Sequence, residues 1–133
     1  MRLRSLMVPA LLPAALWLGV STATGGPKSV HIVSDCNSSE SPAVNPSAPV
    51  HMNHQDYVVW DEPPGRADSW MITPKDAEKW PFPDTIRGDK QHPADSGRPA
   101  ASAPVNDTVS YTVTIFCKSG TTQHIDPIII IGS

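Results

Sequence analysis

The sequence predicts an all-β fold, and three observations support this prediction. Residues 109–117 and 122–131 are rich in β-branched and aromatic residues and flank a Ser119-Gly120 turn, a pattern that indicates an antiparallel hairpin. Along 109–117 every second residue is apolar or aromatic, so one face of this strand is expected to be buried. Shorter runs of the same kind occur upstream, between segments rich in Pro, Gly, Ser and Asn.

The first 23 residues have the pattern of an export signal. Two arginines stand near the start, an apolar run follows over 6–20, and small residues occupy 21–23. A membrane anchor is the weaker interpretation, because the run has about 15 residues where about 20 are needed to span a bilayer, and two prolines interrupt it. We therefore predict a signal peptide over 1–23, one domain over 24–133, no membrane span in the mature chain, and a periplasmic or secreted location.

Charge and cysteine content narrow the class of protein further. The chain of 133 residues has a formal net charge of −3, and loss of Arg2 and Arg4 with the leader leaves −5. No basic patch remains, so nucleic acid is not an expected partner. Cys36 and Cys117 both lie in the exported part, where disulfides form and persist, and we predict that they are joined.

The upstream half is expected to hold three short extended segments. Residues 29–34 alternate as in a strand, with His31 interpreted as an edge residue. Residues 36–49 are rich in Asn, Ser and Pro and are expected to be irregular. Residues 50–53 can be extended, and 57–60 form a second strand that ends before Asp-Glu-Pro-Pro.

The middle of the chain is less regular. Residues 70–73 read as a short strand, and Thr73-Pro-Lys-Asp76 resembles the start of a helix that must end before Pro81. Residues 82–104 show little periodicity and predict a long Pro-rich loop, with a brief strand possible over 103–105. Asp126-Pro127 interrupts the second arm of the hairpin, and 128–131 is an apolar run expected to be covered on both sides.

Several of these segments together resemble the small exported bacterial cupredoxin-like proteins. The resemblance rests on Tyr57-Val-Val-Trp60, Trp70-Met-Ile72, Pro81-Phe82, Ala103-Pro-Val105, Tyr111-Thr-Val-Thr114 and Asp126-Pro-Ile-Ile-Ile130. It implies a Greek-key β-sandwich closed by the C-terminal hairpin. Many members of that family have no copper site.

A type 1 copper site needs two His and one Cys, with a weak axial ligand. The resemblance places the thiolate ligand at Cys117, and His124 follows after six intervening residues. If the hairpin loop has an even number of residues, His124 lies on the same face of the sheet as Cys117. If the number is odd, His124 lies on the opposite face. No histidine occurs over 61–70, where the family has its upstream ligand. We therefore predict no type 1 copper site and no cofactor, with copper as the alternative and His51, His54, Cys117 and His124 as weak candidates.

No motif in the sequence predicts catalysis. Asp61 and Glu62 are adjacent carboxylates on a Pro-rich turn, and no Gly-x-Ser-x-Gly pattern occurs. The chain is interpreted as a binding module for an unknown protein or small ligand, with loops 61–67 and 82–104 as candidate surfaces. Trp70, Trp80 and Phe82 are anchors for a partner if exposed, or caps of the core if buried. The second interpretation is a periplasmic copper-binding or electron-carrier protein.

Overall fold

A computed structural model describes residues 25–34, 36, 41–61, 67–83 and 85–132. The predicted signal peptide and most of the predicted 61–67 loop lie outside these residues. The described chain forms ten strands: β1 Pro27–Val33, β2 Ala43–Asn45, β3 Val50–Met52, β4 Tyr57–Asp61, β5 Ala67–Pro74, β6 Ile86–Asp89, β7 Ala94–Asp95, β8 Asp107–Cys117, β9 Thr122–Ile125 and β10 Ile128–Ile131. Within the described ranges, no helix has the length and apolar character needed to cross a membrane.

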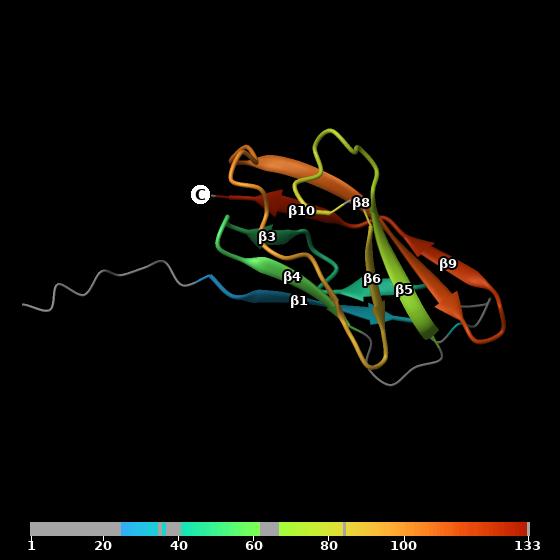
Figure 1. The fold of residues 1–133 in the computed structure, drawn as a ribbon. Coiled ribbons are helices and arrows are strands. Elements are labelled where there is room, and N and C mark those ends of the chain that lie inside the picture. The colour runs from blue at the N-terminus through green and yellow to red at the C-terminus, as the bar shows by residue number, and fades with distance from the viewer. Residues whose placement is uncertain (1–24, 35, 37–40, 62–66, 84, 133) are drawn as a thin grey trace, which may run out of the picture.

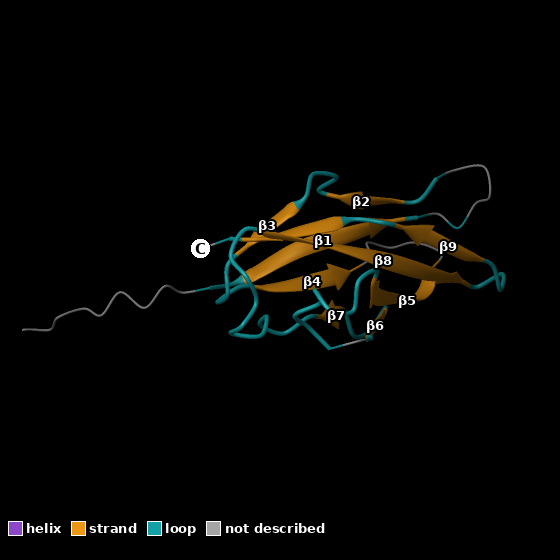
Figure 2. Ribbon diagram, turned by 90° about the horizontal axis from the view of Figure 1, so that it is seen from above, coloured by secondary structure: helices purple, strands orange, loops and turns teal. Residues whose placement is uncertain are grey.

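The strands form two facing sheets, as Figures 1 and 2 show. One sheet has the order β2-β1-β4-β7, and the other has the order β3-β10-β8-β5-β6, with β9 also paired to β8. Both sheets are mixed, because β1 runs parallel to β4 and β10 runs parallel to β3. The inward side chains of both sheets pack into one apolar core. The all-β prediction is confirmed.

The C-terminal hairpin is confirmed in its position and in its buried face. β8 and β9 pair antiparallel across the turn at 118–120, with Thr114 opposite His124. The alternate β8 residues predicted to face the core are all buried: Val109, Tyr111, Val113, Ile115 and Cys117. After the break at 126–127, β10 continues along β8. Ile129 and Ile131 are buried but Ile128 and Ile130 are only half-buried, so the run is fully covered on one face, not on both.

The upstream strands are also found, with one correction. Residues 29–34, 50–53, 57–60 and 70–73 fall in β1, β3, β4 and β5. β1 is not an edge strand, because β2 pairs with one side of it and β4 with the other. His31 therefore lies on an inner strand of the sheet, and its interpretation as an edge residue is wrong.

The predicted helix start at 73–76 is wrong. Thr73 and Pro74 belong to β5, where they pair with Thr112 and Tyr111 of β8. The ladder continues one residue further, since the Lys75 N–H donates to the Ser110 carbonyl. Pairing with β8, the longest of the described strands, outweighs the local capping pattern, and Asp76 leads into a turn over 77–79 instead. The brief strand expected over 103–105 is absent as well, because these residues lie in a loop and a turn.

The prediction of a long loop over 82–104 is wrong, since this segment contributes to both sheets. β6 pairs with β5, and β7 pairs with β4. Gly88 lies against the indole of Trp70, and Ala94 is fully buried. The two strands have four and two residues, which is too short for a periodic pattern to stand out from the surrounding Pro, Gly and Ser residues.

Candidate functional site

A groove at one end of the sandwich is the candidate site. It has a volume of about 340 Å³ and lies between the turn that follows β5 and the loop that precedes β8. Its lining residues are Glu78, Lys79, Trp80, Pro81, Ala100, Ser102, Ala103, Pro104 and Asp107. The two walls are far apart in the sequence but are joined directly, because the Ala100 N–H donates to the Pro81 carbonyl at 2.9 Å.

The first wall is shaped by a turn that uses its own polar groups. The Asp76 carboxylate accepts a hydrogen bond from the Glu78 N–H at 3.1 Å, and the Asp76 carbonyl accepts one from the Lys79 N–H at 3.2 Å. Asp side chains stabilise such turns by bonding to the backbone two residues onward. The turn places the Glu78 and Lys79 side chains on the exposed rim of the groove.

The second wall is fixed by a residue of the turn between β3 and β4. The Nε2 atom of His54 donates to the Ala103 carbonyl at 2.7 Å, and the Ala103 N–H donates to the Ala100 carbonyl at 2.9 Å. His54 lies in the turn between β3 and β4, so this hydrogen bond ties the loop to a separate part of the fold. The loop is therefore held in place although it contains no strand.

Aromatic packing connects the groove to the core. Trp80 contacts Phe82 edge to face at a centroid distance of 5.0 Å and lies 6.0 Å from Tyr111. Tyr111 in turn packs edge to face against Trp60 and accepts a hydrogen bond from the Trp60 indole N–H at 3.2 Å. Burial raises the pKa of Tyr111 to about 12, although the bond from Trp60 acts against this shift. Tyr111 therefore stays neutral, and this cluster serves as a rigid support.

The rim of the groove combines free charges with exposed apolar surface. Glu78, Lys79 and Asp107 line the groove, and none of the three has a salt-bridge partner within the described ranges. Val105, directly after the lining residue Pro104, is 48% exposed and is one of two large apolar side chains exposed in the described chain. A single exposed apolar side chain is ordinary on a protein surface, so Val105 bears on binding only through its place beside the groove.

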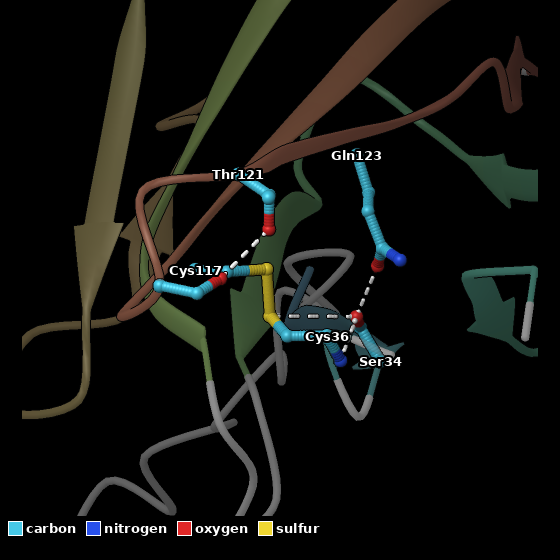
Figure 3. Close-up of a disulfide and its surroundings, with 6 residues drawn as sticks. Ser34, Cys36, Cys117, Thr121 and Gln123 are labelled. Carbon is cyan, nitrogen blue, oxygen red and sulfur yellow. Dashed lines mark hydrogen bonds between the residues drawn. A yellow bond between two sulfur atoms is a disulfide. The ribbon is translucent and has the colours of Figure 1, made fainter. Parts of the chain in front are cut away.

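The disulfide stands near the opposite end of β8. Cys36 and Cys117 are joined as predicted, with their Cα atoms 5.8 Å apart. The Ser34 hydroxyl donates to the side-chain oxygen of Gln123, and the Cys117 N–H donates to the Thr121 carbonyl at 2.9 Å, as Figure 3 shows. This bridge links the end of β1 in one sheet to the β8–β9 turn in the other.

The structure does not bring the weak metal candidates together. The hairpin loop is odd, with three residues between Cys117 and Thr121, so His124 pairs with Thr114 and lies on the face opposite Cys117. His124 instead approaches the Thr114 hydroxyl at 3.3 Å. His51 is exposed on β3, and His54 is bound to the groove loop. Among the described residues, no three His, Cys, Asp or Glu side chains are grouped as metal ligands.

Two buried or paired carboxylates stand outside the groove. Asp61 pairs with His31 through its Oδ1 atom and the Nδ1 atom of the ring, on the outer face of the first sheet. Asp56 is 6% exposed; burial raises its pKa, but hydrogen bonds from the Asn53 and Gly26 N–H groups outweigh this and hold the pKa below its usual value. Asp56 thus fastens the start of β1 to the turn before β4.

The aromatic residues considered as anchors are core residues. Trp70, Trp80 and Phe82 are between 2% and 7% exposed, so they support the surface and are not free to insert into a partner. The candidate surface 82–104 contains one wall of the groove, at 100–104, but sequence patterns did not indicate the other wall, which comes from a turn with no periodicity. The one local signal was the small apolar stretch 100–105, which carries no charge to keep it in solvent.

The chain matches no protein-family model, no curated protein and no solved structure.

Proposed function

We propose that this chain is an exported β-sandwich module that binds a segment of another protein in the groove and has no type 1 copper site. The observation that carries the proposal is the groove itself, with a fixed loop on one wall and the exposed Val105 beside it. Binding sites are commonly loops held by a rigid scaffold, and here His54 and the aromatic cluster provide that support. An open groove with both charged and apolar side chains on its rim fits a polypeptide better than an enclosed small molecule.

Copper binding at Cys117 is not favoured by the geometry. Its sulfur is bonded to Cys36, and the nearest sequence candidate for a second ligand, His124, points from the other face of the sheet. A trigonal site needs a free thiolate and converging imidazoles. The electron-carrier alternative is therefore the second hypothesis, and a copper titration of the purified protein that produced an intense visible band would restore it.

The groove is tested by filling it. Peptides selected from a displayed library on the wild-type protein are expected to lose affinity about tenfold or more for Ser102→Trp, because a bulky side chain at an exposed lining position occupies the space for the ligand. Ser119→Trp is the matched control, since it makes the same exchange at an exposed position in the β8–β9 turn. Equal loss in both variants, or no loss in Ser102→Trp, would place binding elsewhere.

A further inference from the structure

The backbone hydrogen bonds of β9 show which of its groups face outward. The Cys117 N–H donates to the Thr121 carbonyl at 2.9 Å, and the Tyr111 N–H donates to the Pro127 carbonyl at 3.2 Å. Hydrogen-bonded and non-bonded pairs alternate along an antiparallel ladder, so the odd-numbered residues 121–127 turn their backbone groups toward β8. The even-numbered residues Thr122, His124 and Asp126 turn theirs away from it.

Among the strands of the described ranges, none covers this outward edge. β3 pairs with β10 only opposite Ile129–Ile131, and Figure 1 shows β3 and β9 toward opposite ends of β8. The side chains of Thr122, His124 and Asp126 are exposed. In the described part of the chain, the backbone groups of these three residues have no hydrogen-bond partner. The sheet thus has an open edge along 122–126.

The edge lacks three of the devices that usually protect one, although β9 has only four residues and the charged Asp126 follows it. Natural edge strands carry lysines, prolines or bulges that prevent a second strand from pairing. Residues 122–126 contain neither lysine nor proline, and β9 pairs with β8 without a register shift. The proline that follows, Pro127, occupies a position whose backbone faces β8, so its missing N–H removes no donor from the open edge.

We propose that β9 is a self-association site, where two copies of this chain pair β9 with β9 antiparallel around a two-fold axis at His124. This arrangement places Thr122 opposite Asp126 of the second copy, and all the paired backbone positions are outward-facing ones. Each matched pair then exchanges two N–H···O hydrogen bonds. A two-fold interface must be complementary to itself, and here the Thr122 hydroxyl faces the Asp126 carboxylate while the two His124 residues meet at the axis.

The length of the edge sets the strength of the dimer. Five residues on each copy bury less than the roughly 1,200 Å² typical of stable protein interfaces, so the dimer is expected to be reversible and dependent on concentration. The contact lies near the disulfide end of β8, whereas the groove lies at the start of β8. Dimerisation through β9 therefore leaves the groove of each copy open.

Proline substitutions test whether the even-numbered residues, whose backbone groups face outward, form the dimer contact. Sedimentation velocity over a concentration series is expected to show a monomer–dimer equilibrium for the wild type and a dissociation constant about tenfold or more higher for Thr122→Pro and His124→Pro. Both variants remove an outward N–H, so the ladder to β8 and the melting temperature are expected to stay nearly unchanged. Gln123→Pro is the matched control, because it removes an inward N–H opposite Ile115 and is expected to lower the melting temperature.

Amide hydrogen exchange provides the second measurement. Raising the concentration of the wild type is expected to protect the amides of Thr122 and His124 and to leave other exposed amides unprotected. A wild type that stays monomeric at about 1 mM, a dimer that both outward proline variants preserve, or unprotected Thr122 and His124 amides in the dimer would each overturn the proposal.

Discussion

The two sheets are joined differently on the two sides of the sandwich. On one side, the chain passes from β6 to β7 through residues 90–93, and both strands pair with the sheet on which they lie. On the other side, the ends of β1 and β8 are joined by the Cys36–Cys117 bond and by the Ser34–Gln123 hydrogen bond. The first side is closed by backbone pairing and packing, whereas the second is closed by side chains.

Because the two sides are closed differently, we assign stability mainly to the β6–β7 side and interaction with a partner to the disulfide side. On the β6–β7 side, each strand pairs with one neighbour, Gly88 lies against Trp70, and Ala94 is fully buried, so this side contributes mainly to packing. On the disulfide side, a covalent bond holds the sheets together, and no strand of the described residues pairs with the outer edge of β9. A sandwich that is closed by a covalent bond does not need a further strand over that edge, and the edge stays available for association.

The largest loss of stability is expected from removing the β6–β7 side. Replacing residues 87–98 by a short Gly-Ser link deletes β7 and most of β6, uncovers Trp70 and leaves the edge of β5 unpaired. Because a small domain is stable by only about 5–15 kcal/mol, this loss of burial and pairing is expected to unfold the protein. Thermal denaturation followed by circular dichroism checks this, with the exposed substitution Gln91→Ala as control. A cooperative transition near the wild-type temperature would show that the segment is a loop after all.

The next largest loss of stability is expected from removing the Cys36–Cys117 disulfide on the other side of the sandwich. Replacing Cys36 and Cys117 together by Ala opens a loop of 81 residues, which in the chain-entropy model lowers the free energy of unfolding by about 4 kcal/mol. Urea denaturation of the variant and of the oxidised wild type measures the difference. If the difference were under about 1 kcal/mol, side-chain contacts such as Ser34–Gln123 would be sufficient to close this side.

Sequence patterns were informative where strands are long and one face is buried. β8 has 11 residues, and its alternation from Val109 to Cys117 predicted the buried face correctly. The Ser119-Gly120 turn predicted the hairpin, but the face of His124 depended on whether the loop is odd or even, which the sequence left open. The disulfide was predicted from the cysteine count and the compartment, without any geometric information.

Prediction from the sequence failed where neighbours in space decide the structure. β6 and β7 are too short for periodicity, and they exist because β5 and β4 each provide an edge for pairing. Pro74 continues a strand for the same reason, in spite of a pattern typical of a helix start. The groove was not predictable either, because its two walls come together through contacts such as Ala100 with Pro81 and His54 with Ala103.

The smallest loss of stability is expected from a substitution that adds one carbon atom to the tightly packed β6–β7 side. A Cβ atom added at Gly88 would stand 2.4 Å from the indole nitrogen of Trp70 and 2.6 Å from the backbone nitrogen of Ala94, well inside contact distance. Trp70 cannot move away freely, because it is 2% exposed and its N–H donates to the Trp60 carbonyl at 3.1 Å. Overpacking of this kind typically destabilises a core by about 1–3 kcal/mol, so we expect Gly88→Ala to lower the free energy of unfolding by that amount.

Gly26→Ala is the matched control for this substitution. No atom lies within 4 Å of a Cβ added at Gly26, so the same exchange there is expected to be neutral or to stabilise by about 0.4–1 kcal/mol through the lower entropy of the unfolded chain. Urea denaturation of both variants gives the comparison. Equal stabilities would mean that β6 can shift away from Trp70 without loss. A selective loss in Gly88→Ala would instead show that this side is closed by tight packing around Trp70.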